Sequence, residues 1–165
     1  MERLFSPWRS RYIASFKEEQ KGACIFCSRS REPDSPESLV VWRGERVFLI
    51  LNLYPYNSGH LMAVPYRHVG SLLELDEAEL LELWRAARLA IRALDELMRP
   101  HGYNLGMNLG RVAGAGIEDH VHLHIVPRWN GDTNFMPVLG EVKVISEALE
   151  ETWHRLREIL PRLTP

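Results

Sequence analysis

His120-Val121-His122-Leu123-His124-Ile125-Val126 is a run in which three histidines alternate with apolar residues. Strict alternation is the period of a β-strand, so we expect the three imidazoles on one face and the apolar side chains on the other. Same-face neighbours on a strand lie roughly 6.6 Å apart, so the rings would form a row along one wall of a site. Buried imidazoles cost desolvation that Val or Leu would avoid. The row therefore indicates function rather than packing.

Shorter strands are predicted upstream of this run. Residues 39–42 and 47–51 are apolar and flank Arg43-Gly44-Glu45, which predicts a hairpin with Gly44 supplying the turn. A third strand, residues 60–65, follows a short loop. Connections of this length favour antiparallel pairing because they are too short for crossover helices.

One long helix is expected over residues 76–99. Asp76 is a suitable N-cap with Glu79 three residues later, and Pro100 follows the predicted end. Apolar residues with helical spacing form a stripe that we assign to the core or to an interface. The stripe consists of Leu80, Leu83, Trp84, Ala87, Ala90, Ile91, Leu94, Leu97 and Met98.

The remaining segments are assigned by the same criteria. Residues 103–109 return to strand before a glycine-rich turn at 110–116, and a short helix is predicted at 8–20. Residues 142–145 are expected to be extended, followed by a C-terminal amphipathic helix with Ser146 as N-cap. The whole predicts an α+β fold: an antiparallel sheet of about five strands, with a long helix after strand three and a helix at the C-terminus.

Composition limits the classes of protein that fit. The chain has 165 residues, 45% of them apolar, which suits one domain spanning residues 1–165. A formal net charge of −2 argues against binding nucleic acid through a basic surface. The apolar runs are far too short for a membrane span, and the first residues lack a basic-then-apolar signal pattern. We therefore expect a cytoplasmic protein with no nucleic-acid or membrane partner.

Several motifs together resemble the histidine triad superfamily of nucleotide hydrolases and transferases. The H-x-H-x-H run carries the resemblance, and Asn52-Leu-Tyr-Pro-Tyr-Asn-Ser-Gly-His60 and Val64-Pro-Tyr-Arg-His68 resemble the family's ribose-binding and second-strand motifs. The stretch from Gly114 to Phe135 resembles bacterial members related to diadenosine tetraphosphate phosphorylases and hydrolases. The resemblance covers about residues 24–137. It implies a small-molecule nucleotide substrate, with diadenosine polyphosphates as the expected class. Adenosine mononucleotide amidates and nucleotide sugars offer an α-phosphate to the same nucleophile, so they stay open as substrates.

The resemblance implies catalytic roles for four histidines. His122 would be the nucleophile, with its other ring nitrogen held by the backbone carbonyl of His120, while His124 and His60 would contact the phosphate or tune the nearby charge. A neutral imidazole can attack a phosphoryl group and form a covalent phosphoramidate that a second nucleophile opens. This chemistry requires no catalytic metal, although the substrate could bind as a magnesium complex.

Substrate-binding residues follow from the same resemblance. Asn52 lies eight residues before His60, at the family position that bonds the ribose hydroxyls, and Asn108 could add a donor near the phosphate. Gly114 and Gly116 stand where many members carry a Ser or Gln that binds the α-phosphate. Backbone N–H donation is therefore favoured there, since closely spaced glycines let N–H groups converge on an anion. Taken alone, the glycine run would be an ordinary loop.

Two further residues follow the histidine run. Arg128 and Trp129 could serve a distal phosphate or a second nucleoside, and Trp129 could instead pack in the interior.

Cys24 and Cys27 form a C-x-x-C pair. Several bacterial histidine triad proteins pair such a motif with two histidines, here His68 and His120, and this resemblance implies a structural zinc site. Two alternatives stay open. The cysteines could be reduced thiols near Phe26, or a redox dithiol, which is disfavoured because no strand precedes the motif and no clear helix follows it.

Two other functions compete with nucleotidyl transfer. In a metallohydrolase, His120, His122 and His68 would bind a catalytic zinc, because H-x-H on a strand can supply two ligands to one metal. In a non-catalytic nucleotide sensor, the pocket would be kept without turnover. For quaternary structure, the apolar stripe of helix 76–98 and the sheet edges favour a homodimer, as does the family resemblance.

Overall fold

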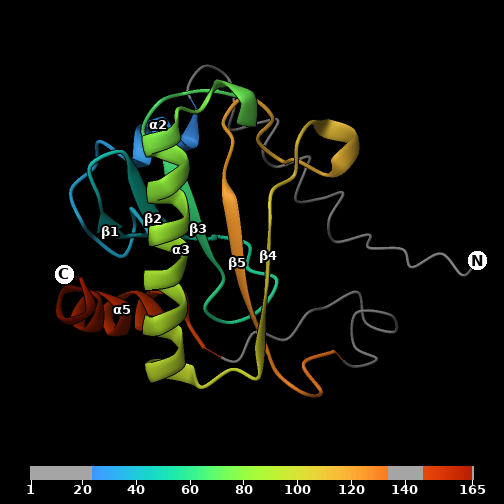
Figure 1. The fold of residues 1–165 in the computed structure, drawn as a ribbon. Helices are drawn as coiled ribbons and strands as arrows, with labels where there is room; N and C mark the ends of the chain where they lie inside the picture. The colour runs from blue at the N-terminus through green and yellow to red at the C-terminus, as the bar shows by residue number, and fades with distance from the viewer. Residues whose placement is uncertain (1–23, 134–146, 165) are drawn as a thin grey trace, which may run out of the picture.

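The computed structural model describes residues 24–133 and 147–164, whose arrangement is drawn in Figure 1. In chain order the elements are α2 (Ile25–Arg29), β1 (Val40–Arg43), β2 (Val47–Leu51), β3 (Leu61–Pro65), η1 (Leu72–Glu74), α3 (Glu77–Met98), β4 (Gly102–Gly106), η2 (Arg111–Ala113), β5 (Leu123–Arg128) and α5 (Leu149–Leu163). The predicted helix at 8–20, the extended segment at 142–145 and Ser146 lie outside the described residues.

The sheet has five strands in the order β1-β2-β3-β5-β4, and every neighbouring pair is antiparallel. Helix α3 crosses one face of this sheet, and α5 packs against α3 and β1 (Figure 1). This confirms the predicted α+β fold with a long helix after the third strand. The central position of β5 matters for function, because this strand carries part of the histidine run between β3 and β4.

Helix α3 begins as predicted. The carboxylate of Asp76 accepts from the N–H of Glu79 at 2.8 Å, and Glu79 accepts in return from the N–H of Asp76 at 2.9 Å, which completes a capping box. The helix ends where Arg99 adopts a left-handed conformation with φ of 47°. Trp84 of the predicted stripe does not belong to the core of the chain: it is 55% exposed, because it lies one position beyond the buried Leu83 around the helix. Its assignment to an interface stays a prediction.

The histidine run enters the sheet later than predicted. Strand β5 starts at Leu123, so His120 and His122 precede it. The reason is a different backbone partner, since the N–H of Val121 donates to the carbonyl of Val69 at 2.7 Å rather than to a strand of the sheet. The expected alternation still holds, because Val121, Leu123 and Ile125 all belong to the buried core.

Gly44 is required in the β1–β2 hairpin by lack of space rather than by its backbone angle. A Cβ at this position would lie 2.1 Å from Oε1 of Glu82 and 2.5 Å from the ring of Trp42. Glu82 comes this close because its carboxylate accepts from the backbone N–H groups of Glu45 at 2.7 Å and Arg46 at 3.0 Å. Helix α3 thus caps the hairpin turn.

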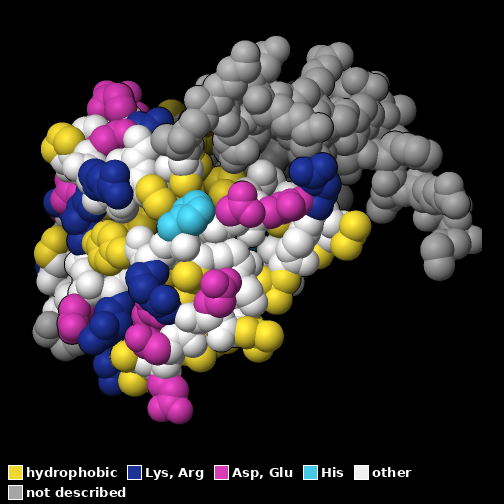
Figure 2. Space-filling view, turned by 90° about the horizontal axis from the view of Figure 1, so that it is seen from above, with side chains coloured by type: hydrophobic (Ala, Val, Ile, Leu, Met, Phe, Trp, Pro, Cys, Tyr) yellow, Lys and Arg dark blue, Asp and Glu magenta, His cyan; other side chains and the backbone are white. Residues whose placement is uncertain are grey.

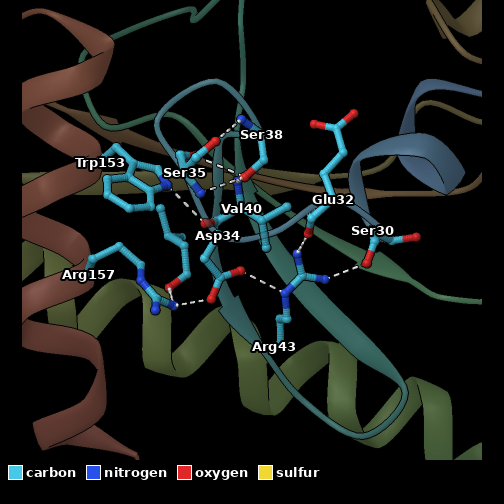
Figure 3. A network of polar contacts seen from close by, with 10 residues as sticks. Ser30, Glu32, Asp34, Ser35, Ser38, Val40, Arg43, Trp153 and Arg157 are labelled. Atoms are coloured by element: carbon cyan, nitrogen blue, oxygen red, sulfur yellow. Dashed lines mark hydrogen bonds and ion pairs between the residues drawn. The ribbon is translucent and has the colours of Figure 1, made fainter.

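A polar network ties the segment before β1 to the C-terminal helix (Figure 3). Asp34 accepts from Arg43 at 2.8 Å and pairs with Arg157 of α5 at 3.0 Å. The indole N–H of Trp153 donates to the carbonyl of Val40 at 2.9 Å. Helix α5 is therefore fixed on the β1 side of the sheet. It begins at Leu149 with Ala148 as N-cap, which corrects the predicted cap at Ser146.

Charged side chains of both signs are mixed on the face seen from above in Figure 2. Within residues 24–133 and 147–164, no helix has the length and apolar character needed to cross a bilayer.

Candidate functional site

The first pair of site residues is His120 and His122. Ring atom Nδ1 of His122 lies 2.8 Å from the carbonyl oxygen of His120. Because a carbonyl can only accept, Nδ1 of His122 carries the proton and Nε2 keeps its lone pair. Burial lowers the pKa of His122, and the bond to the His120 carbonyl opposes this only in part. The ring is therefore held neutral, with Nε2 as a potential nucleophile.

The second pair, His60 and His124, is fixed in the opposite sense. The backbone N–H of Tyr56 donates to Nδ1 of His60 at 3.0 Å, so the proton of neutral His60 resides on Nε2. That N–H donates to Nδ1 of His124 at 3.0 Å, which leaves the proton of His124 on Nε2. The rings of His122 and His124 lie 4.7 Å apart. Of these two neighbouring rings, His122 therefore has a lone pair on Nε2 and His124 has an N–H group on Nε2.

Asn52 directly follows β2 and is buried beside this relay. Its Oδ1 accepts from the backbone N–H of Tyr54 at 3.0 Å, and its Nδ2 lies 3.5 Å from Nδ1 of His60. These contacts orient the amide group. Asn52 also lines a hollow next to His122, as the predicted ribose-binding role requires.

This first hollow is mostly apolar and narrow, about 50 Å³ in volume. Its walls come from α2, β2, β3 and the glycine-rich loop. They consist of Ile25, Phe26, Arg29, Leu39, Ile50, Leu51, Asn52, Leu53, Tyr56, Met62, Asn108, Gly114, Gly116, Ile117, His122 and His124. Phe26 also contacts the rings of His120 and His122, with centroids 5.4 and 4.9 Å away. Sequence reasoning missed this role of Phe26.

The glycine-rich loop differs from the expectation in how its N–H groups are used. Gly110 and Gly114 adopt positive φ angles of 82° and 92°. The N–H of Gly114 donates to the carbonyl of Arg111 at 2.9 Å, and that of Ala115 points to the carbonyl of Gly110 at 3.3 Å. Backbone donation from Gly114 to an anion is therefore not what this loop provides. Because Gly114 has no side chain, a ligand in the hollow could come close to the backbone at this position.

Cys24, Cys27, His68 and His120 come together in one cluster. Their four ligand atoms lie within 4.8 Å of one another. Nε2 of His120 is 2.8 Å from the carbonyl of Pro65 and donates to it, so the lone pair on Nδ1 faces Sγ of Cys24 at 3.2 Å. Burial lowers the pKa of His120 to about 4, which keeps that lone pair available. Two thiols and two imidazoles are a standard donor set for a closed tetrahedral zinc site, so these residues could hold a metal ion.

The surroundings of the cysteines correct one detail of the prediction. Cys24 is the N-cap of α2 and Cys27 lies inside this short helix, so a helix does accompany the motif. The proximity of both histidines still favours metal binding over a redox dithiol. The rings of His120 and His122 face different partners. Within the described residues the metal cluster includes the ring of His120 but not that of His122. In the described residues the two rings of the H-x-H pair thus face different groups, which disfavours their binding one metal together.

A second hollow, about 410 Å³ in volume, lies along β4 and β5. It is lined by Tyr56, Asn57, Asn104, Leu105, Gly106, Met107, Asn108, Ala113, His124, Val126 and Arg128. The ring of Tyr56 stacks on His124 with centroids 5.8 Å apart and planes inclined by 26°. Of these residues, sequence reasoning had singled out Asn108, His124 and Arg128 as candidates, but not Tyr56, Asn57 and Asn104.

A neutral histidine with a free ring nitrogen, beside a second histidine that donates, on a five-stranded antiparallel sheet, defines a histidine triad protein. The model of the HIT domain matches residues 34–131, and the chain belongs to this family. The chain is 42% identical over 162 residues to the AP-4-A phosphorylase of Mycobacterium tuberculosis, covering 92% of this chain and 80% of that protein. It is 32% identical over 95 residues to the asymmetrical bis(5'-nucleosyl)-tetraphosphatase of Schizosaccharomyces pombe, covering 58% of this chain and 52% of that protein.

Solved structures agree with this assignment. A zinc-bound histidine triad family protein from Mycobacterium smegmatis has a TM-score of 0.68 and 26% identity, covering 86% of this chain and 95% of that one. A hypothetical histidine triad nucleotide-binding protein from Sulfolobus tokodaii also has a TM-score of 0.68, with 32% identity, covering 85% of this chain and 93% of that one.

Proposed function

We propose that this protein is a nucleotidyl hydrolase or phosphorylase that attacks the α-phosphate of diadenosine polyphosphates through a covalent nucleotidyl-histidine intermediate on His122. The observation that carries the proposal is the tautomer of each ring: His122 keeps its lone pair on Nε2 and His124 its proton on Nε2, and the two ring centroids lie 4.7 Å apart. The similarity to proteins named AP-4-A phosphorylase and bis(5'-nucleosyl)-tetraphosphatase supports the choice of substrate.

In the first step, Nε2 of His122 donates its electron pair to the α-phosphorus. A P–N bond forms as the bond to the bridging oxygen breaks, and that oxygen leaves with its electron pair on the departing nucleotide. The Nδ1–H bond to the His120 carbonyl stabilises the positive charge that develops on the ring. The Nε2–H of His124 would donate to a phosphoryl oxygen, where charge accumulates in the transition state.

In the second step, water or inorganic phosphate attacks the same phosphorus. The P–N bond breaks and its electron pair returns to Nε2 of His122, which regenerates the neutral ring. A water molecule loses its proton to solvent, whereas an oxygen of inorganic phosphate can attack in ionised form. The site requires no catalytic metal for either route, although the substrate could enter as a magnesium complex.

The nucleoside of the attacked nucleotide would occupy the first hollow. Ile50, Leu53 and Phe26 would form apolar walls for the base, and Asn52, which lines the same hollow, would bind the ribose hydroxyls. The hollow is narrow, so the side chains that line it must move apart to admit a purine. Asn108 and the small residues Gly114 and Gly116 would border the phosphate.

We further propose that Cys24, Cys27, His68 and His120 hold a structural zinc ion. The convergence of four ligand atoms supports this, as does the similarity to a zinc-bound family member. When bound, the metal would pin α2 and the segment around His68 to the backbone that carries His120. In this proposal the reaction itself is carried out by His122 and His124, and the metal has a structural role.

The expected assembly is a homodimer. Strand β4 is an edge of the sheet, and its residues Asn104, Leu105 and Gly106 are exposed, so its ladder is open to pairing with a second copy. Light scattering at micromolar concentration would give about twice the chain mass of 19.1 kDa. A mass of one chain would contradict it. The cytoplasmic location stays a prediction from the sequence.

Product analysis tests the proposed function. Diadenosine tetraphosphate should be cleaved to ADP and ATP with inorganic phosphate as acceptor, or to AMP and ATP with water. Rapid quenching in acid-free denaturant should trap an adenylylated chain whose modification maps to His122. Binding of the dinucleotide without any product under both conditions would instead support the nucleotide sensor.

A further inference from the structure

We infer that the second hollow binds the polyphosphate of the leaving nucleotide, with Arg128 as the residue that selects long, highly charged leaving groups. This inference rests on the proposed function, because it assumes that His122 attacks an α-phosphate whose nucleoside lies in the first hollow. It adds the part of the substrate that the first hollow does not hold.

The two hollows meet at the reacting centre. Tyr56, Asn108 and His124 line both of them, whereas the nucleophile His122 lines the first alone. A leaving group departs on the side of the phosphorus away from the nucleophile in an in-line displacement. The second hollow begins beside His124 and runs along β4 and β5 to Arg128, so it offers a continuous path for the rest of the substrate.

The chemistry of the second hollow suits a polyanion. Arg128 is the one side chain with a full charge among the residues that line it, and Asn57, Asn104 and Asn108 add amide groups. No carboxylate lines this hollow within the described part of the chain. A polyphosphate would therefore meet a cation and the amide groups of Asn104 and Asn108, whereas Asn57 uses both of its amide hydrogens on Pro127 and Asp132. The first hollow, by contrast, is mostly apolar.

Arg128 is held in position before any ligand binds. Asp132 accepts from its Nε at 2.6 Å and from one terminal nitrogen at 2.9 Å, and Asn104 accepts from the other terminal nitrogen at 2.8 Å. Asn57 donates to the same carboxylate at 2.7 Å and to the carbonyl of Pro127 at 3.0 Å. A guanidinium has five N–H donors, so three contacts leave two for a phosphate. Fixing the group in advance reduces the entropy lost on binding.

The substrate class follows from this arrangement. Leaving groups that carry several phosphates reach Arg128, whereas a small neutral leaving group ends near His124. Because the second step reverses the direction of the first, the acceptor enters along the path that the leaving group vacated. Inorganic phosphate, itself an anion, would therefore use the same hollow.

The test compares two substrates in Arg128→Gln. Diadenosine tetraphosphate has a triphosphate-bearing leaving group, and adenosine 5'-phosphoramidate releases only ammonia. We expect kcat/KM for the tetraphosphate to fall about 10- to 100-fold, the effect of removing hydrogen bonds from a charged donor, while kcat/KM for the phosphoramidate changes less than about 2-fold. The KM for inorganic phosphate should rise in parallel.

Arg157→Gln is the matched control. Arg157 also pairs with an aspartate, at 3.0 Å, but lies on α5 and lines neither hollow, so its loss should leave the ratio of the two substrates unchanged. Arg128→Lys is the second variant: it keeps the charge without the planar fork, and should show the same selectivity with a smaller loss. Equal losses for both substrates, or no loss for either, would overturn the inference. If the unmodified protein cleaved neither substrate, the proposed function would fall and this inference with it.

Discussion

The carbonyl oxygen of His120 lies 2.8 Å from Nδ1 of His122, while Nδ1 of the His120 ring lies 3.2 Å from Sγ of Cys24. One residue thus belongs to two sites: its ring faces the candidate metal cluster and its backbone fixes the tautomer of the candidate nucleophile. Displacing the ring of His120 would also move its carbonyl. The metal cluster and the nucleophile should therefore be coupled, although in the proposed mechanism the metal would not touch the substrate.

The first prediction concerns this coupling. Cys24→Ser should reduce zinc from about one ion per chain to a small fraction, lower the unfolding midpoint and decrease kcat about 10- to 100-fold, the range found when groups that orient a site are lost. Metal analysis, thermal unfolding and kinetics measure the three effects. A chelated wild-type sample is the control and should behave in the same way. Complete loss of turnover would favour a catalytic metal, and unchanged zinc content would show that Cys24 is not a ligand.

The nucleophile is tested by His122→Asn. Turnover of diadenosine tetraphosphate should fall by about 10⁴-fold or more, because Asn cannot form the phosphoramidate. The dissociation constant of the nucleotide should change little, since binding uses the hollow walls. His154→Asn on α5 is the control, as this histidine is largely exposed, contacts Glu150 and the ring of Trp153, and lines neither hollow. Near-normal turnover in His122→Asn would end the proposed mechanism.

The pH dependence follows from the burial of His122. Burial lowers the pKa of this ring below the ordinary value of about 6.5, so the neutral, nucleophilic form persists as the pH falls through 6.5. The acid limb of kcat/KM should therefore lie below pH 6.5. Diadenosine tetraphosphate has no terminal phosphate to titrate in this range, so the limb reports the free enzyme. An acid limb above pH 6.5 would mean that the ring is more easily protonated than its burial implies.

Local patterns predicted the parts of the site that depend on neighbouring residues. Alternation along the histidine run predicted the core positions Val121, Leu123 and Ile125. The set of cysteines and histidines that the structure brings together was implied by the resemblance to histidine triad proteins, and the residues alone supplied only the C-x-x-C pair. The catalytic roles of the histidines stay predictions. The start of β5 was wrong because it depends on the contact between Val121 and Val69, which lie far apart in sequence.

The second hollow could not be predicted for the same physical reason. Its walls depend on the pairing of β4 with β5, in which Asn104 faces Val126 and Gly106 faces His124. Nothing in the composition of residues 102–106 fixes this register. Tyr56 was missed as well, since a tyrosine in a loop carries no pattern that shows it stacking on His124.

The last prediction tests the hairpin cap. Gly44→Ala would place a Cβ 2.1 Å from Oε1 of Glu82, so the carboxylate must move and release the N–H groups of Glu45 and Arg46. We expect a loss of about 1–3 kcal/mol in the free energy of unfolding, measured by urea denaturation. Gly102→Ala is the matched control, because nothing lies within 4 Å of a Cβ there and its φ is not positive, so its stability should stay within about 0.5 kcal/mol.

A double-mutant cycle separates the cap from simple crowding. In a Glu82→Ala background the cap is already absent, so Gly44→Ala should cost clearly less than in the wild type, with only the contact to the Trp42 ring, 2.5 Å from the new Cβ, remaining. If Gly44→Ala lowered the free energy of unfolding equally in the wild type and in Glu82→Ala, the loss would come from the contact with Trp42 and not from the cap by Glu82. A cost near zero in the wild type would show that the turn accommodates a side chain, and that the glycine is not required by the approach of α3.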